Sequence, residues 1–237
     1  MVETTRKREG ILPPDLRSFG RRRGRALSPR QDQLMRELLP RLALDIARPP
    51  PPSLADLFPA NVREVWLEIG FGGAEHLIWQ AAKHPSVGLI GCEPFEDGVV
   101  KALTGIEERN LKNIRLYVDD AREVLRWLPS ASVNRTFILF PDPWPKRRHH
   151  KRRLVSASLI SELARVMAAG GELRIATDIG DYARTALIAL QNSPFSWQAA
   201  RPEDWRVRPE DWPATRYQAK ALREGRRCYF FRFLRNA

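Results

Sequence analysis

The sequence predicts an α/β fold built on one open, mostly parallel β-sheet with helices on both faces. Short apolar stretches alternate with helix-like stretches five times in series, which is the pattern of consecutive β-α units. The last two strand-like stretches, 195–200 and 228–234, have no helix of clear period between them, so we expect them to pair antiparallel. The chain has 237 residues, 43% hydrophobic and 29% charged, which is enough to bury a substantial core.

The five predicted strands are short runs rich in apolar and β-branched residues. They lie at residues 62–69, 87–92, 114–118, 133–140 and 172–176. Helices are predicted at residues 74–83, 96–109, 121–128, 156–168 and 181–191. Gly170-Gly171 is expected to end the helix at 156–168.

The connection 201–227 is long for a compact domain, which indicates either a functional loop or disorder. It contains two copies of Arg-Pro-Glu-Asp-Trp that end at Trp205 and Trp212. Surface packing is the favoured role of these two rings, and stacking on a nucleic-acid base is the alternative.

We expect the chain to divide near residue 52. Residues 1–52 are predicted to be a basic, partly disordered segment with one short helix, whose N-cap is Ser28, and a stiff linker at Pro49–Pro52. Residues 53–237 are predicted to form the α/β domain.

Several classes of protein are excluded or disfavoured by composition. No apolar run approaches the roughly 20 residues that a spanning helix needs, and the N-terminus has no apolar signal segment, so we expect a cytoplasmic protein without membrane contact. The two cysteines, Cys92 and Cys228, are far apart and outside any C-x-x-C motif, so we expect reduced core thiols, no disulfide and no metal. We expect a monomer or a homodimer.

Positive charge is concentrated in two segments of this chain, whose net charge is +12. Residues 1–30 contain nine Arg or Lys and three acidic residues, and residues 146–153 contain six Arg or Lys and no acid. Neither segment has the apolar face of a helix that lies on a membrane. The second segment directly follows Pro141-Asp142-Pro143-Trp144, where a site can use it, so the pattern favours a polyanion partner such as nucleic acid over a merely solvated face.

Acidic residues lie at the ends of the first three predicted strands, where ligands bind in open α/β sheets. The first strand ends in Glu68-Ile69-Gly70-Phe71-Gly72, whose glycines permit a tight turn. A dinucleotide fingerprint needs a third glycine where Glu75 stands, and that carboxylate would repel a pyrophosphate, so NAD is disfavoured. S-adenosylmethionine has no phosphate and carries positive charge, so it suits an acidic turn.

Glu93 ends the second strand, 23 residues after Gly70, at the position where a carboxylate holds ribose hydroxyls. Asp119-Asp120 ends the third strand, where one of the pair can contact an adenine amino group or cap the next helix. Asp142 ends the fourth strand between two prolines that stiffen its backbone, beside the stacking face of Trp144.

Taken together, these segments resemble the bacterial tRNA (guanine-N7-)-methyltransferase family. The resemblance rests on Leu67-Glu68-Ile69-Gly70-Phe71-Gly72, Phe140-Pro141-Asp142-Pro143-Trp144 with its basic run, Ala176-Thr177-Asp178, Thr215-Arg216-Tyr217 and Arg17-Ser18-Phe19-Gly20-Arg21-Arg22. It implies a class I (Rossmann-like), seven-stranded, mostly parallel sheet with an antiparallel last strand. It also implies methylation of N7 of guanine 46, in the variable loop of tRNA, with S-adenosylmethionine as cofactor.

The same resemblance implies roles for single residues. Cofactor contacts are implied for Glu68, Gly70, Gly72, Glu93 and Asp120. Asp142 is implied to be catalytic, and substrate contacts are implied for Lys146, Asp178, Thr215 and Tyr217.

Two positions depart from the family pattern. Ala74 replaces the third glycine of the turn, which we expect to be a mild change, and Gln218 replaces the usual Glu of Thr-x-Tyr-Glu. The alternatives to this function are methylation of an amino group in nucleic acid or protein and noncatalytic RNA binding. Amino-group enzymes typically carry Asn/Asp-Pro-Pro-Tyr at the fourth strand, and this chain lacks the second proline. The intact acidic strand ends argue against a noncatalytic protein.

Overall fold

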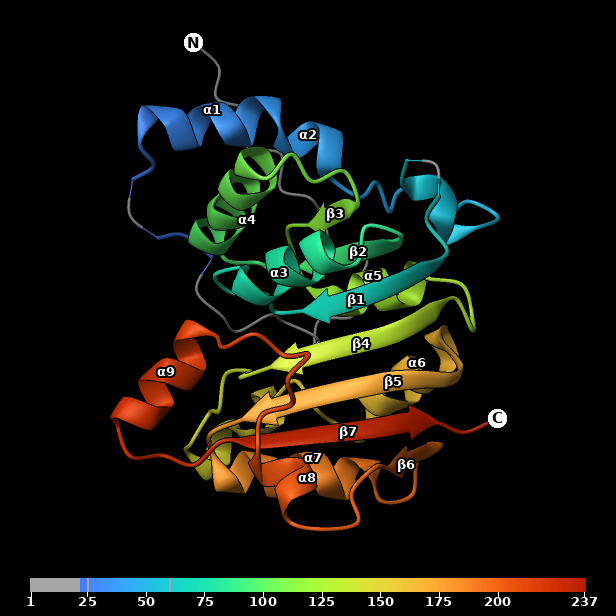
Figure 1. Ribbon diagram of the computed structural model, residues 1–237, viewed down its shortest axis with the longest axis vertical. Coiled ribbons are helices and arrows are strands. Elements are labelled where there is room, and N and C mark those ends of the chain that lie inside the picture. Colours follow the sequence, from blue (N-terminus) through green and yellow to red (C-terminus); the bar gives the residue numbers. More distant parts are fainter. Residues whose placement is uncertain (1–21, 25, 60) are drawn as a thin grey trace.

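A seven-stranded sheet forms the centre of the computed structural model, which describes residues 22–24, 26–59 and 61–237 (Figure 1). Its strands are β1 (Glu64–Ile69), β2 (Val87–Cys92), β3 (Ile114–Tyr117), β4 (Val133–Leu139), β5 (Met167–Thr177), β6 (Phe195–Trp197) and β7 (Tyr229–Arg235). The spatial order is β3-β2-β1-β4-β5-β7-β6. Strands β1 to β5 pair in parallel, and β7 is antiparallel to both neighbours, β5 and β6. The predicted seven-stranded fold is confirmed.

Helices cover both faces of this sheet because residues alternate between its faces along each strand. On one face lie α1 (Pro29–Glu37), α2 (Leu39–Leu42), α3 (Glu75–Lys83), α4 (Glu96–Glu108) and α9 (Arg216–Arg223), and on the other lie α5 (Ala121–Trp127), α6 (Ala157–Val166) and α7 (Gly180–Leu190). On β1, Trp66 packs with the first group and Leu67 with the second. The result is two apolar cores, one on each side of the sheet.

The described part of the N-terminal segment packs on the sheet domain. Ser28 caps α1 with a capping box, and Leu34 and Leu42 are buried with residues of α3 and α4. Ala43 forms an isolated parallel bridge with Leu116 of β3. The boundary at residue 52 stays a prediction, and the disorder expected in this segment concerns residues that mostly lie outside the described ones.

The long connection after β6 differs from the prediction, because it contains two short helices, α8 (Glu203–Arg206) and α9. Each has only one or two turns, which is too short for a clear apolar period. Trp212 is 2% exposed and packs edge-on against Phe230, and Trp205 stacks on Tyr229. Trp212 is therefore a core residue rather than a surface one.

Four further elements differ from the sequence prediction. Helix α6 ends at Val166, and β5 already begins at Met167, which pairs with Val133 of β4. Gly170-Gly171 thus lies within the strand and does not end the helix. Two 3-10 helices were not predicted, η1 (Leu54–Leu57) and η2 (Arg147–Arg152), and η2 holds most of the second basic run.

Candidate functional site

A pocket of about 470 Å³ opens at the carboxyl ends of β1 to β4, around the point where the strand order reverses between β1 and β4. Its apolar lining comes from strand ends and α5, and includes Ile69, Cys92, Leu125 and Leu139. Its polar lining includes Glu93, Asp119, Asp120 and Asp142. The acidic ends of β2, β3 and β4 therefore meet in one cavity.

The turn between β1 and α3 forms one wall of this pocket. Gly70 and Gly72 line it and have φ angles of 74° and 53°, which favour glycine. Ala74 also has a positive φ, 63°, as the N-cap residue of α3, and its side chain caps no amide. The change from glycine to Ala74 was expected to be mild on the basis of packing alone. The structure adds backbone strain, on the order of 1 kcal/mol, for a non-glycine residue in this region.

Glu93 fixes the glycine turn to the end of β2. Its Oε2 accepts a hydrogen bond of 2.8 Å from the Gly72 amide, and its Oε1 accepts one of 3.0 Å from the Phe95 amide. The residue is 8% exposed. Burial raises the pKa of the Glu93 carboxyl, and these two amides only partly offset that rise.

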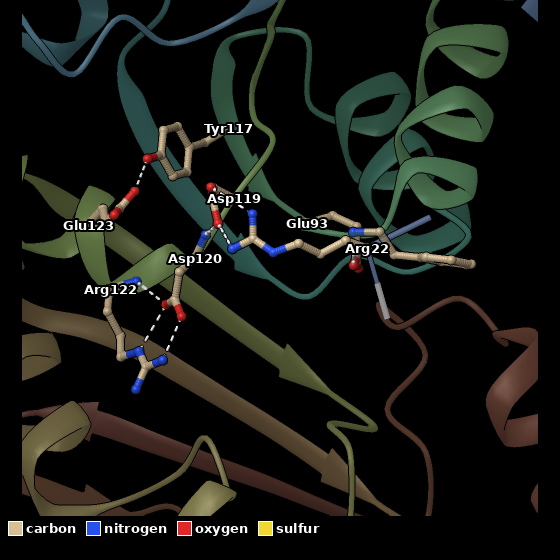
Figure 2. A network of polar contacts seen from close by, with 8 residues as sticks. Arg22, Glu93, Tyr117, Asp119, Asp120, Arg122 and Glu123 are labelled. Carbon is tan, nitrogen blue, oxygen red and sulfur yellow. Dashed lines mark hydrogen bonds and ion pairs between the residues drawn. The ribbon is translucent and has the colours of Figure 1, made fainter. Parts of the chain in front are cut away.

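The two aspartates after β3 each pair with an arginine (Figure 2). Asp120 is the N-cap of α5 and accepts from the Arg122 amide and from the Arg122 guanidinium, with Nη2 to Oδ2 at 2.5 Å. Asp119 binds Arg22 of the N-terminal segment, with Nη2 to Oδ1 at 2.7 Å. The capping role that the sequence left open thus belongs to Asp120, a residue that lines the pocket and whose carboxylate is engaged by Arg122.

Asp142 lies in a loop with strained flanks. Phe140 and Trp144, on either side of it, have φ angles of 52° and 42°, a region that non-glycine residues seldom adopt. Asp142 itself is solvent-accessible within the concave pocket, and burial by the surrounding walls raises the pKa of its carboxyl. Among the described residues, no hydrogen bond or ion pair engages this carboxylate.

The second basic run contains one structural arginine among its exposed cations. Arg147, Arg148 and Lys151 are exposed, and Lys151 lines the pocket mouth. Arg153 instead is 6% exposed, donates to the Pro143 carbonyl at 3.0 Å and pairs with Asp181 at 2.5 Å. Arg153 therefore supports the Asp142 loop from behind.

Four of the residues implied by the resemblance lie outside the pocket lining. Glu68 is buried on the α3 side of the sheet, with Oε2 2.8 Å from His76 Nδ1. Asp178 pairs with Arg226 at 2.7 Å, and buried Thr215 is the N-cap of α9. Lys146 is exposed at the start of η2. Their ligand contacts stay predictions.

Tyr217, in contrast, lines the pocket and lies against Gly72. Beside it lies Arg216, which interacts with Glu75 at the start of α3. The sequence prediction missed Arg122, which lines the pocket, and the pairing of Arg216 with Glu75 at its edge. Both depend on contacts that periodicity along the chain does not reveal.

The described residues contain neither a metal-binding cluster nor a membrane-spanning helix. No group of three or more His, Cys, Asp or Glu in the described ranges could hold a metal ion. None of the helices described is both long enough and apolar enough to cross a membrane.

Comparison with known proteins gives consistent matches. The model of a family described as "Putative methyltransferase" matches residues 62–231. The chain is 49% identical to the tRNA (guanine-N(7)-)-methyltransferase of Rhodopseudomonas palustris strain BisB5, over 92% of this chain and 86% of that protein. It is 50% identical to the protein of the same name from Hyphomonas neptunium, over 91% of this chain and 98% of that protein. The solved structure of the 16S rRNA methyltransferase KamB matches with a TM-score of 0.56 and 14% identity, over 75% of this chain and 90% of that one, which is a likeness of fold.

Proposed function

Because the chain belongs to the tRNA (guanine-N7-)-methyltransferase family, we propose that it transfers a methyl group from S-adenosylmethionine to N7 of guanine 46 in tRNA. The observation that carries this proposal is the pocket that joins Glu93, Asp120 and Asp142 beside the exposed cations of η2. A cytoplasmic location and a monomeric or homodimeric state stay predictions.

The pocket residues fit the proposed cofactor. S-adenosylmethionine combines ribose hydroxyls, an adenine ring and a positively charged sulfur. Glu93 supplies a carboxylate that can accept from ribose hydroxyls, and the apolar ends of β1, β2 and α5 supply walls for the adenine ring. Gly70 and Gly72 have no Cβ, so they can adopt positive φ angles and let the backbone of the turn approach a ligand closely. Asp120 remains a candidate contact because it lines the pocket.

The proposed reaction does not require a strong general base. When bound, S-adenosylmethionine supplies an electrophilic methyl group. Guanine N7 has an exposed lone pair, loses no proton when it takes the methyl group, and leaves a cationic ring. The enzyme therefore has to align the base and provide negative potential where positive charge develops. The Asp142 carboxylate, engaged by no other described residue, can accept the N1 and N2 donors of guanine and offset that charge.

The cations around the pocket supply affinity for the tRNA backbone. Arg147, Arg148 and Lys151 are exposed on η2, directly after the Asp142 loop. Phosphate contacts made there would place a neighbouring nucleotide at the pocket mouth. A flipped guanine can then enter between Asp142 and Tyr217.

Nucleoside analysis tests this function directly. Purified protein is incubated with methyl-labelled S-adenosylmethionine and a tRNA transcript that has guanine 46, and the digested RNA is separated by chromatography. We expect label in N7-methylguanosine, and none in a matched transcript with adenine at position 46. Label in another nucleoside, or equal label in both transcripts, would contradict the proposal.

A further inference from the structure

We propose that Arg216 and Glu75 are positioning residues that dock the start of α9 on the glycine turn and thereby couple tRNA binding to cofactor binding. This inference rests on the proposed function, and it adds two residues to which the family resemblance implies no role. It concerns the first turn of α9, which follows the predicted substrate contact Thr215 and contains Tyr217.

Two adjacent glycines provide the surface on which α9 docks. A Cβ atom on Gly72 would lie 2.9 Å from Tyr217 Cε2 and 3.0 Å from its hydroxyl oxygen. A Cβ atom on Gly73 would lie 2.9 Å from Arg216 Cζ and 2.7 Å from the Glu75 carboxylate oxygens. These separations are shorter than ordinary van der Waals contacts of a Cβ atom, so a Cβ at Gly72 would displace the Tyr217 ring and one at Gly73 would displace the ends of the Arg216 and Glu75 side chains.

The same turn is attached to the cofactor side of the pocket. Gly72 donates its amide to Glu93 Oε2 at 2.8 Å. Its carbonyl oxygen is so close to α4 that a Cβ on Gly98 would lie 2.3 Å away. A movement of α9 is therefore transmitted through one peptide unit to the carboxylate proposed to hold the ribose. Arg216 also acts through space, because its charge lowers the pKa of Glu93 against the effect of burial.

The docking contact is weak enough to open. Arg216 Nε lies 3.7 Å from Glu75 Oε1, and both side chains are 39% exposed. An ion pair this accessible contributes little stability in isolation. If tRNA and cofactor each bind more tightly when α9 is docked, each ligand increases the affinity for the other by the same factor.

The coupling factor is measured by calorimetry with the full chain. S-adenosylhomocysteine, which cannot transfer a methyl group, is titrated into the protein alone and into the protein saturated with a tRNA transcript. We expect the affinity of the wild type for this probe to rise about 5-fold or more with tRNA. In Arg216→Ala and Gly73→Ala the ratio should fall to near one. Arg216→Lys should retain part of it, because the charge is kept.

Matched variants separate positioning from a general loss of structure. Gly73 has no positive φ, so its alanine variant acts through the Arg216 and Glu75 side chains rather than through backbone strain, and its melting temperature should stay close to that of the wild type. Lys220→Gln removes a charge from the far end of α9, where it pairs with Glu224, and should leave the coupling factor unchanged.

The outcomes distinguish this inference from the proposed function. A wild type that forms N7-methylguanosine at position 46 but shows a coupling factor of one would overturn the inference alone. Unchanged coupling in Arg216→Ala and Gly73→Ala would also overturn it. Absence of the modified nucleoside with the wild type would instead contradict the proposed function.

Discussion

Glu93 in the pocket and Glu172 on β5 are buried to nearly the same degree, 8% and 6% exposed, yet their carboxyl groups have opposite pKa shifts. Burial raises the pKa of Glu93, and the amide hydrogen bonds it accepts do not compensate fully. Burial acts on Glu172 too, but Arg174 and its neighbours outweigh it and lower the pKa of that group. The difference between the two sites is the supply of cations.

Glu172 lies in a cluster of acids and arginines that pair with one another. Glu172 pairs with Arg174 at 2.8 Å, with Arg135 at 3.0 Å and with Arg232 at 2.6 Å. Arg174 also pairs with Asp211 at 2.6 Å, which ties the loop before α9 to the sheet. Each charge in this cluster has a partner within the protein, so the cluster stabilises the fold without needing a ligand.

Two acids of the pocket are arranged in the opposite way, although Asp119 and Asp120 in the same pocket are paired with Arg22 and Arg122. Glu93 and Asp142 form no ion pair with any described residue, and burial keeps the pKa of both above the usual range. Carboxylates held in that condition favour a cationic partner from outside. The sulfonium of the proposed cofactor and the methylated guanine both carry such a charge. The comparison thus separates Glu172, whose charge is neutralised by arginines of the protein, from Glu93 and Asp142, which have no such ion pair among the described residues.

The largest effect is expected when the charge of Asp142 is removed. Asp142→Asn keeps the size of the side chain, so the rate of methyl transfer in a single turnover should fall by about 10²- to 10³-fold, as when one preorganised electrostatic interaction is removed. The affinity for tRNA should change much less. A decrease in affinity as large as the decrease in rate would show that Asp142 binds the ground state instead.

Glu172→Gln should instead reduce stability. Removing the carboxylate takes a partner from Arg135, Arg174 and Arg232 together and leaves the 2% exposed Arg174 with Asp211 alone. We expect the free energy of unfolding in urea to fall by about 3 kcal/mol. Asp32→Asn, at an exposed pair with Arg36, is the control and should change it by less than about 1 kcal/mol. Equal effects of the two variants would contradict the distinction between a buried cluster and surface pairs.

The sequence indicated the pocket acids Glu93 and Asp142, but it did not indicate the cluster around Glu172. Glu93 and Asp142 were identified because strand ends meet at one edge of a parallel sheet, so position along the chain sufficed. Glu172 was missed as the centre of a cluster because strand pairing between distant segments brings Arg135 and Arg232 to it. Asp211 was missed because a loop brings it to Arg174. Helix α9 was missed because its eight residues are mostly polar, and it is fixed by contacts with the glycine turn.

The arginines of the second basic run test whether exposed cations bind tRNA while a buried one stabilises the fold. Replacing the exposed Arg147 and Arg148 by Gln should weaken tRNA binding and reduce its salt slope by up to about 0.7 to 0.9 for each phosphate that is no longer neutralised. Arg153→Gln, although it lies in the same run, should mainly lower the melting temperature, because Arg153 is already engaged by Asp181 and the Pro143 carbonyl. Binding is measured by fluorescence anisotropy at several salt concentrations. An unchanged salt slope in the double variant would show that Arg147 and Arg148 contact solvent rather than tRNA phosphates.

The most specific prediction is the opposite pH dependence of stability at Asp142 and Glu172, and its Asp142 part is the smallest effect expected. For Asp142 the folded-state pKa is raised, so the native state binds more protons than the unfolded chain between the two pKa values, and stability declines as pH rises through that window. Asp142→Asn should therefore melt slightly above the wild type at neutral pH, with the difference vanishing as pH falls to the ordinary aspartate value of about 3.9.

For Glu172 the folded-state pKa is lowered, so its stabilisation is present at neutral pH and is lost as pH falls through that lowered value. Glu172→Gln should accordingly melt below the wild type at neutral pH, and the gap should narrow only in acid. Melting curves without cofactor from pH 3 to 8 measure both differences, and two differences of the same sign at neutral pH would show that the pocket acids are held as favourably as the buried cluster.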